Sequence, residues 1–484
     1  MELLNKVKSS YLNKLLQINK LYLVLIFIFI FFYIIKNNIF LCLSLLSIWI
    51  FNVIYSLIKI NKRYIFLIFN VIFFLFLMGQ ICFDVLLSSP NIQIFDNNII
   101  RHTLFCLGIS LITLFVVTYL FNDESDISFQ VKRNVSLEMF FFLMFCVSSV
   151  FVLIKYFEMF LSIKDNGYLF YYTQFQTTLP SIVYQIANLY QLAFYSWLAL
   201  FPPKKYLYIG SIIFLIISLC TMLNGQRGTA MINLVLLLTY YFIRDHLQVD
   251  EKSFFTKKKI IVFVFLGFIC MLVLNYINLL RYGNFENLSN PLSSIFSFIY
   301  NNGGSYKVIS YQELYKDYFQ TDKIYCLYPL EYMIKNNILT RMFFNPIIYT
   351  SNTIEMATLT NNFSEAISYI VLGERYLLGE GLGGCYIAEI YCNFNYLGVL
   401  LINALYAIFM IKIPKLIRSN YFIGSLVLLS LSSLYWAPRS HSLEFISKPF
   451  ESSNIFIFLG IFILYKMGTF EYINNKLNKI KEKK

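Results

Sequence analysis

Residues 64–87, YIFLIFNVIFFLFLMGQICFDVLL, decide the fold class of this chain. Asp84 is the one charged residue in this apolar stretch. A helix of roughly 20 residues crosses about 30 Å of hydrocarbon, so the stretch is long enough to span a bilayer. It directly follows Lys62 and Arg63, and Lys and Arg mark the cytoplasmic ends of spans. We therefore predict a transmembrane helix over 64–87.

The composition of the 484-residue chain extends this interpretation to the whole protein. Hydrophobic residues make up 58% and charged residues 13%, with a mean hydropathy of +0.64, whereas globular chains carry roughly 25% charged residues. A soluble enzyme is excluded. The net charge of +13 comes from Lys and Arg clustered between apolar runs, which indicates orientation in a lipid bilayer and not nucleic-acid binding.

Twelve apolar runs are candidate spans in an all-α polytopic membrane protein. They lie near 21–35, 39–58, 64–87, 99–121, 137–161, 181–201, 206–223, 229–243, 260–280, 387–411, 421–436 and 453–467. The cations lie in alternate connections, as in the segments 59–63, 132–133, 204–205, 244–259 and 412–418. Because cytoplasmic loops are rich in Lys and Arg, twelve spans with both termini in the cytoplasm satisfy this asymmetry.

The connection between the ninth and tenth predicted spans is far longer than the others. It runs for roughly 105 residues, from Arg281 to Tyr386, on the external side, which is enough for a small domain. Residues 305–319 and 330–344 carry apolar side chains at helical spacing and predict amphipathic helices at the outer surface. We expect three parts: spans 1–9 in 1–280, the loop in 281–386, and spans 10–12 with a basic cytoplasmic tail in 387–484.

Arginines and glycines gather at the outer ends of the predicted spans. They are Arg227 in the turn Gly225-Gln226-Arg227-Gly228, Arg281 at the end of the ninth span, Arg375 ahead of the loop that contains Gly381, Gly383 and Gly384, and Arg439 before the last span. A helix N-terminus beside a guanidinium favours a phosphate or diphosphate. Each Arg alone could equally extend to lipid headgroups. Lys and Arg are normally concentrated in cytoplasmic loops, so four arginines on the external side together favour an anion site.

Two further residues at this face are candidates for proton transfer. Glu389 is expected within a helical turn of the membrane surface, and because an acid facing lipid is costly, we expect it to face a groove. His441 follows Arg439 on a short external turn and is a plausible base, although neighbouring arginines would weaken its basicity. Either residue could be the base; we favour His441, with Glu389 orienting the acceptor. Asp84 and Glu138 lie at span ends and are expected to be solvated.

Metal and nucleotide sites lack support in the sequence. The three histidines, His102, His246 and His441, are far apart and no HExxH motif occurs, so we expect no metal. No P-loop or GxGxxG motif indicates a nucleotide cofactor. Cys326 and Cys385 both fall in the external loop, where they could form a disulfide or remain two free thiols.

The G-x-R-G turn 225–228, the long external loop, the stretch 381–394 (GLGGCYIAEIYCNF) and Arg439 before the last span resemble the bacterial O-antigen polymerase (Wzy) family. Ser440 and Asn395 stand where that family commonly has glycine. The resemblance implies a fold like that of C-type glycosyltransferases, with about twelve transmembrane helices, in the bacterial inner membrane.

The resemblance also implies a reaction. Family members polymerise oligosaccharide repeat units carried on undecaprenyl diphosphate at the periplasmic face, which predicts an inverting glycosyl transfer without a cofactor and a chain-length regulator as a possible partner. Arg227, Arg281 and Arg439 would stabilise the leaving diphosphate, Arg375 would clamp the substrate, and Gly225, Gly228, Gly381, Gly383 and Gly384 would shape the binding turns.

Two other activities fit part of the pattern. An O-antigen ligase would use a similar loop and similar arginines but a different acceptor. A lipid-linked oligosaccharide flippase would share the spans, yet it would need no large external loop and would carry its charges deeper in the membrane.

Overall fold

The computed structural model describes residues 20–89, 92–121, 133–166, 175–256 and 291–469, with isolated positions 258, 259, 262, 267, 269, 272 and 472. No β-strand occurs within these residues. The predicted all-α fold is therefore confirmed for the part of the chain that the structure describes. The helices of four or more residues are α2 (Lys20–Ile34), α3 (Asn38–Ile58), α4 (Ile60–Phe73), η1 (Phe74–Met78), α5 (Gly79–Leu86), α6 (Asn97–Phe121), α7 (Val135–Asn166), α9 (Ser181–Asn188), α10 (Tyr190–Ala199), α11 (Lys204–Leu223), α12 (Arg227–His246), α14 (Pro291–Asn302), α15 (Tyr306–Leu314), α16 (Tyr328–Lys335), α17 (Ile338–Phe344), α18 (Ile354–Leu359), α19 (Phe363–Leu372), α20 (Glu374–Leu377), α21 (Tyr386–Ser419), α22 (Tyr421–Trp436), α23 (Glu444–Ser447) and α24 (Ser452–Lys466).

Seven helices in the described residues are long and apolar enough to cross a membrane. They are Asn38–Ile58, Ile60–Leu86, Asn97–Phe121, Val135–Asp165, Lys204–Met222, Tyr386–Ser419 and Tyr421–Arg439. Residues 444–450 and 452–466 form a pair bent by 47°, which would make an eighth span. The multi-pass membrane fold is thus confirmed. The predicted span at 181–201 forms two short helices, α9 and α10, and most of the ninth predicted span, 260–280, lies outside the described residues.

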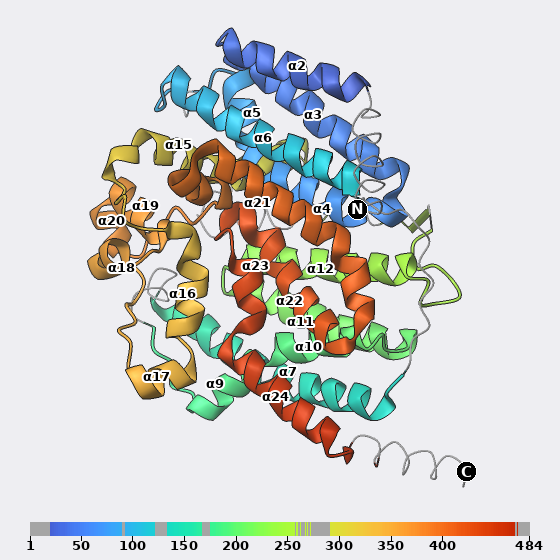
Figure 1. The fold of residues 1–484 in the computed structure, drawn as a ribbon. Helices are drawn as coiled ribbons and strands as arrows, with labels where there is room; N and C mark the ends of the chain where they lie inside the picture. The colour runs from blue at the N-terminus through green and yellow to red at the C-terminus, as the bar shows by residue number, and fades with distance from the viewer. Residues whose placement is uncertain are drawn as a thin grey trace, which may run out of the picture.

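The helices of the long connection gather at one end of the bundle, at the left in Figure 1. Two of these helices, α14 and α15, bind a buried carboxylate of α5. Asp84 is fully buried and accepts hydrogen bonds from the hydroxyls of Tyr300 (2.7 Å) and Tyr306 (2.9 Å). The expectation that Asp84 would be solvated is wrong, because loop hydroxyls replace the water. Glu138 is also buried and accepts a 2.9 Å hydrogen bond from Arg133.

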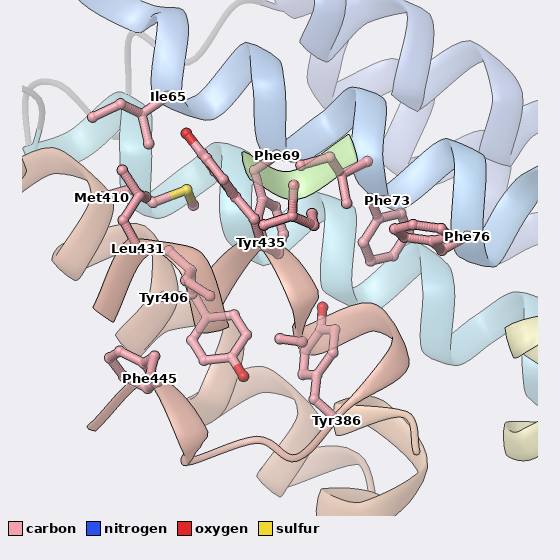
Figure 2. Packing of buried hydrophobic residues seen from close by; sticks show 14 of the residues in the cluster. Ile65, Phe69, Phe73, Phe76, Tyr386, Tyr406, Met410, Leu431, Tyr435 and Phe445 are labelled. Carbon is pink, nitrogen blue, oxygen red and sulfur yellow. The ribbon is translucent and has the colours of Figure 1, made fainter. Parts of the chain in front are cut away.

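Aromatic packing joins α4 to the two late helices that carry the candidate site. Figure 2 shows Phe69 and Phe73 of α4 near Tyr406 of α21 and Tyr435 of α22, and the rings of Phe69 and Tyr406 lie 6.1 Å apart. Helix α21 is broken at Asn395, whose φ of 51° and ψ of −153° are not helical. The short first part of α21 is thereby directed separately from the rest of the helix.

Candidate active site

Glu389 and His441 form the centre of the site although they are 52 residues apart in sequence. Nδ1 of His441 lies 2.7 Å from Oε2 of Glu389, while Oε1 accepts hydrogen bonds from the backbone N–H (3.1 Å) and hydroxyl (2.5 Å) of Ser442. Glu389 is 0% exposed, so these bonds replace its hydration. Because a carboxylate only accepts hydrogen bonds, the proton belongs on Nδ1, and Nε2 lies on the opposite side of the ring.

Two elements position this pair. Glu389 lies in the first turn of α21, where the helix dipole favours a negative charge. His441 lies in the turn between Arg439 and α23, and Tyr406 from the second part of α21 donates a 2.7 Å hydrogen bond to the Ser442 carbonyl. Figure 2 shows Tyr406 close to Tyr386 and Phe445. The broken helix thus supplies both the carboxylate and a support for the histidine turn.

The long connection before α21 contributes a residue that covers the histidine. The ring of Tyr328, in α16, lies 5.3 Å from the ring of His441, and the His441 side chain is 16% exposed. Burial lowers the pKa of His441, but Glu389, Glu444 and Glu365 outweigh it and raise the pKa above its ordinary value. We expected neighbouring arginines to weaken this base; the nearby carboxylates have the opposite effect.

The cationic half of the site lies around Arg439. Its guanidinium carbon is 5.3 Å from the ring centre of Phe76 and 5.9 Å from that of Trp436. In the described ranges, no carboxylate pairs with Arg439. The charges of Arg227 and Arg439 lie close enough to repel each other. Two neighbouring guanidinium groups make this part of the candidate site cationic, which favours the binding of an anion.

Glycines allow close packing around the turns of the candidate site. A Cβ atom on Gly228 would lie 2.2 Å from a ring carbon of Trp436, and one on Gly384 would lie 3.2 Å from the carbonyl oxygen of Ser440. Gly225 and Gly383 have φ values of 76° and 77°, which favour glycine. The glycines thus let the segment that follows Arg227 pack against the Trp436 ring, and let the segment that precedes Glu389 pack against the backbone beside His441.

The remaining predicted residues lie apart from this cluster or outside the description. Arg375 pairs with Glu380, and its side chain is 66% exposed. Gly381 lies near Ser368, whose hydroxyl accepts a 3.1 Å hydrogen bond from the N–H of Leu382. Arg281 lies outside the described residues. Cys326 and Cys385 are both free, buried thiols.

Sequence reasoning missed three supporting residues. Ser442 occupies one oxygen of Glu389, Tyr406 holds the Ser442 carbonyl, and Tyr328 covers His441. Adjacency to His441 could have indicated Ser442. No local pattern marks the two tyrosines, because both reach the site from distant helices.

The family model described as O-antigen polysaccharide polymerase Wzy matches residues 18–469, nearly the whole chain. No curated protein and no solved structure matches significantly.

Proposed function

The chain belongs to the O-antigen polysaccharide polymerase Wzy family, and from this premise we propose that it polymerises undecaprenyl-diphosphate-linked oligosaccharide repeat units into O-antigen or a related surface polysaccharide. The reaction takes place at the periplasmic face of the inner membrane. The observation that carries the proposal is the His441–Glu389 pair beside Arg439 and Arg227. It combines a base with a cationic site for a leaving diphosphate.

In the proposed reaction, a hydroxyl at the non-reducing end of the acceptor attacks the anomeric carbon of the donor glycan. Nε2 of His441 takes the hydroxyl proton, and Glu389 stabilises the resulting imidazolium through Nδ1–H. The bond between the anomeric carbon and the diphosphate oxygen breaks as the new glycosidic bond forms, which inverts the configuration. Arg227 and Arg439 stabilise the negative charge on the departing lipid diphosphate. The proton on His441 then passes to solvent.

The proposed topology has twelve spans, cytoplasmic termini and a periplasmic loop at 281–386. Reporter fusions at Asn302, in the loop helix α14, and at Lys252, in the connection after α12, test it. Activity of a periplasmic reporter is expected at Asn302 alone. Cytoplasmic signals at both positions would remove the site from the periplasm.

A gene-deletion experiment separates polymerase from the related activities. A strain that lacks this chain should keep lipopolysaccharide capped with a single repeat unit and lose the longer ladder. Rescue with the wild-type chain should restore the ladder, whereas a His441→Ala variant expressed at the same level should not. Loss of every O-antigen unit from the lipid would instead indicate a ligase or a flippase. The family premise also suggests a chain-length regulator as a partner, whose co-purification would be a separate test.

A further inference from the structure

An apolar groove lies between α4 with η1 on one side and α12 on the other. Its cavity has a volume of about 300 Å³, and its lining includes Ile68, Ile72 and Phe76 on one side and Met231, Val235 and Leu238 on the other. Among the lining residues, Val71 is 40% exposed, whereas Ile72 is buried. The groove therefore has a closed floor and an open side.

One end of the groove, at Phe76 and Met231, lies next to the cationic half of the candidate site. On α12, Met231, Val235 and Leu238 follow Arg227 at spacings of four, four and three residues, so all four lie along one helix face. On the other side, Phe76 lines the groove, and its ring centre is 5.3 Å from the guanidinium carbon of Arg439. Each wall of the groove thus leads to one of the two arginines.

The groove also extends deep into the bundle. Its lining continues along α12 to Phe242, about 17 Å from Met231 at 1.5 Å per helical residue. That distance is more than half of the ~30 Å hydrocarbon thickness. A ligand that fits both ends must carry an anionic head and a long apolar chain.

We infer that this groove holds the polyprenyl chain of the lipid diphosphate substrate, with its head group between Arg227 and Arg439. The inference rests on the proposed function for the identity of the lipid. A polyprenyl diphosphate matches paired cations better than a phospholipid does, because a diphosphate presents more phosphate oxygens to two guanidinium groups. The bound polyprenyl chain would hold the donor in place so that the anomeric carbon of the donor faces His441.

Photocross-linking of the full-length protein tests the placement without requiring turnover. The probe is undecaprenyl diphosphate that carries a diazirine in its isoprenoid chain and no sugar. Labelling is expected on the groove faces of α4 and α12, around Ile72 and Val235. Unlabelled undecaprenyl diphosphate should compete, and an equal excess of phosphatidylglycerol should not. Labelling elsewhere on the membrane surface, or equal competition by phosphatidylglycerol, would overturn the inference.

A matched pair of variants tests the same groove through its shape. Val235→Trp should fill the groove and reduce labelling several-fold. Leu234→Trp, at a neighbouring position on α12 that is 44% exposed and outside the groove lining, should label like the wild type. Undiminished labelling of a folded Val235→Trp protein would contradict the inference.

The two proposals can fail separately. If the wild-type protein is labelled in the groove but forms no polymer from repeat units, the groove stands and the proposed function fails. If the protein polymerises, Val235→Trp should lose activity with an undecaprenyl-linked donor and keep it with a farnesyl-linked donor. Equal activity of Val235→Trp and wild type with the undecaprenyl-linked donor would overturn the groove and leave the proposed function intact.

Discussion

Nδ1 of His441 lies 2.7 Å from a carboxylate oxygen of Glu389, a residue with no exposed surface. Glu389 is therefore placed to orient and charge-stabilise the histidine. From the sequence we expected Glu389 to orient the acceptor, and that role stays a prediction. In the structure, both of its carboxylate oxygens already have hydrogen-bond partners, His441 and Ser442.

Both members of this pair should be required for turnover. Glu389→Gln keeps the shape, but its amide cannot hold a proton on Nδ1 in the same way, so Nε2 should lose its basic lone pair. The turnover of both Glu389→Gln and His441→Ala should fall steeply; a comparable tautomer change in a serine protease lowers kcat by about 10⁴.

A reconstituted polymerisation assay measures that turnover, and binding of the lipid-linked donor to the same samples controls for folding. An active His441→Ala enzyme beside an inactive Glu389→Gln enzyme that still binds donor would assign the base role to Glu389.

The pH dependence follows from the raised pKa of His441. As a base, His441 must be neutral, so the rate should rise with pH through a pKa above the ordinary value of about 6.5. The stability contribution has the opposite sign: the imidazolium–carboxylate pair stabilises fully below about 6.5 and this is lost as pH rises through the folded pKa. Initial rates and melting temperatures measured across the same buffers test both slopes. A flat rate profile would contradict a titrating base.

Arginine substitutions separate anion binding from simple positive charge. Arg439→Lys removes the planar group that lies over Phe76 and Trp436, and lysine lacks the paired donors that grip a diphosphate. Arg227→Lys should also lose activity, because lysine lacks the paired donors that bind a diphosphate. Both variants should shorten the lipopolysaccharide ladder at normal protein level.

The matched control for both substitutions is Arg375→Lys, because Arg375 is exposed and paired with Glu380. It should retain the ladder. A full ladder in the Arg439→Lys strain would remove that residue from the site.

Gly228 should tolerate no side chain. In Gly228→Ala, the new Cβ would meet the Trp436 ring at 2.2 Å, and overpacking of this kind costs about 1–3 kcal/mol. The melting temperature and activity should both fall, because Trp436 lies over Arg439. Gly460→Ala, in α24 with no atom within 4 Å of the new Cβ, should leave both close to the wild-type values. Equal melting temperatures for the two variants would contradict the packing argument.

Asn395 occupies a backbone conformation that only glycine adopts without strain, with φ 51° and ψ −153°. Such strain costs on the order of 1–3 kcal/mol. Asn395→Gly should therefore raise the melting temperature of the purified protein and leave the break in α21 in place. A lower melting temperature would mean that the Asn395 side chain stabilises the break more than its backbone strain opposes it.

The sequence was enough to predict the helical membrane fold and to point to the residues of the candidate site. In a bilayer, backbone polar groups must be satisfied within each span, so a long apolar run such as 64–87 predicts a helix. Because successive spans cross the membrane in opposite directions, the sequence predicted that Arg227, Glu389 and Arg439 lie at the same face of the membrane. Glycines 225, 228, 383 and 384 were recognisable from the sharp turns between spans.

The burial, exposure and pKa of individual side chains followed only from the tertiary structure. Asp84 is buried because Tyr300 and Tyr306 reach it from the distant loop. Arg375 is exposed because its own loop pairs it with Glu380. The pKa of His441 rises because three helices bring carboxylates to one turn. These outcomes depend on which helices pack against one another. The burial and electrostatic environment of a side chain come from residues that are distant in sequence, so a local stretch of sequence does not contain them.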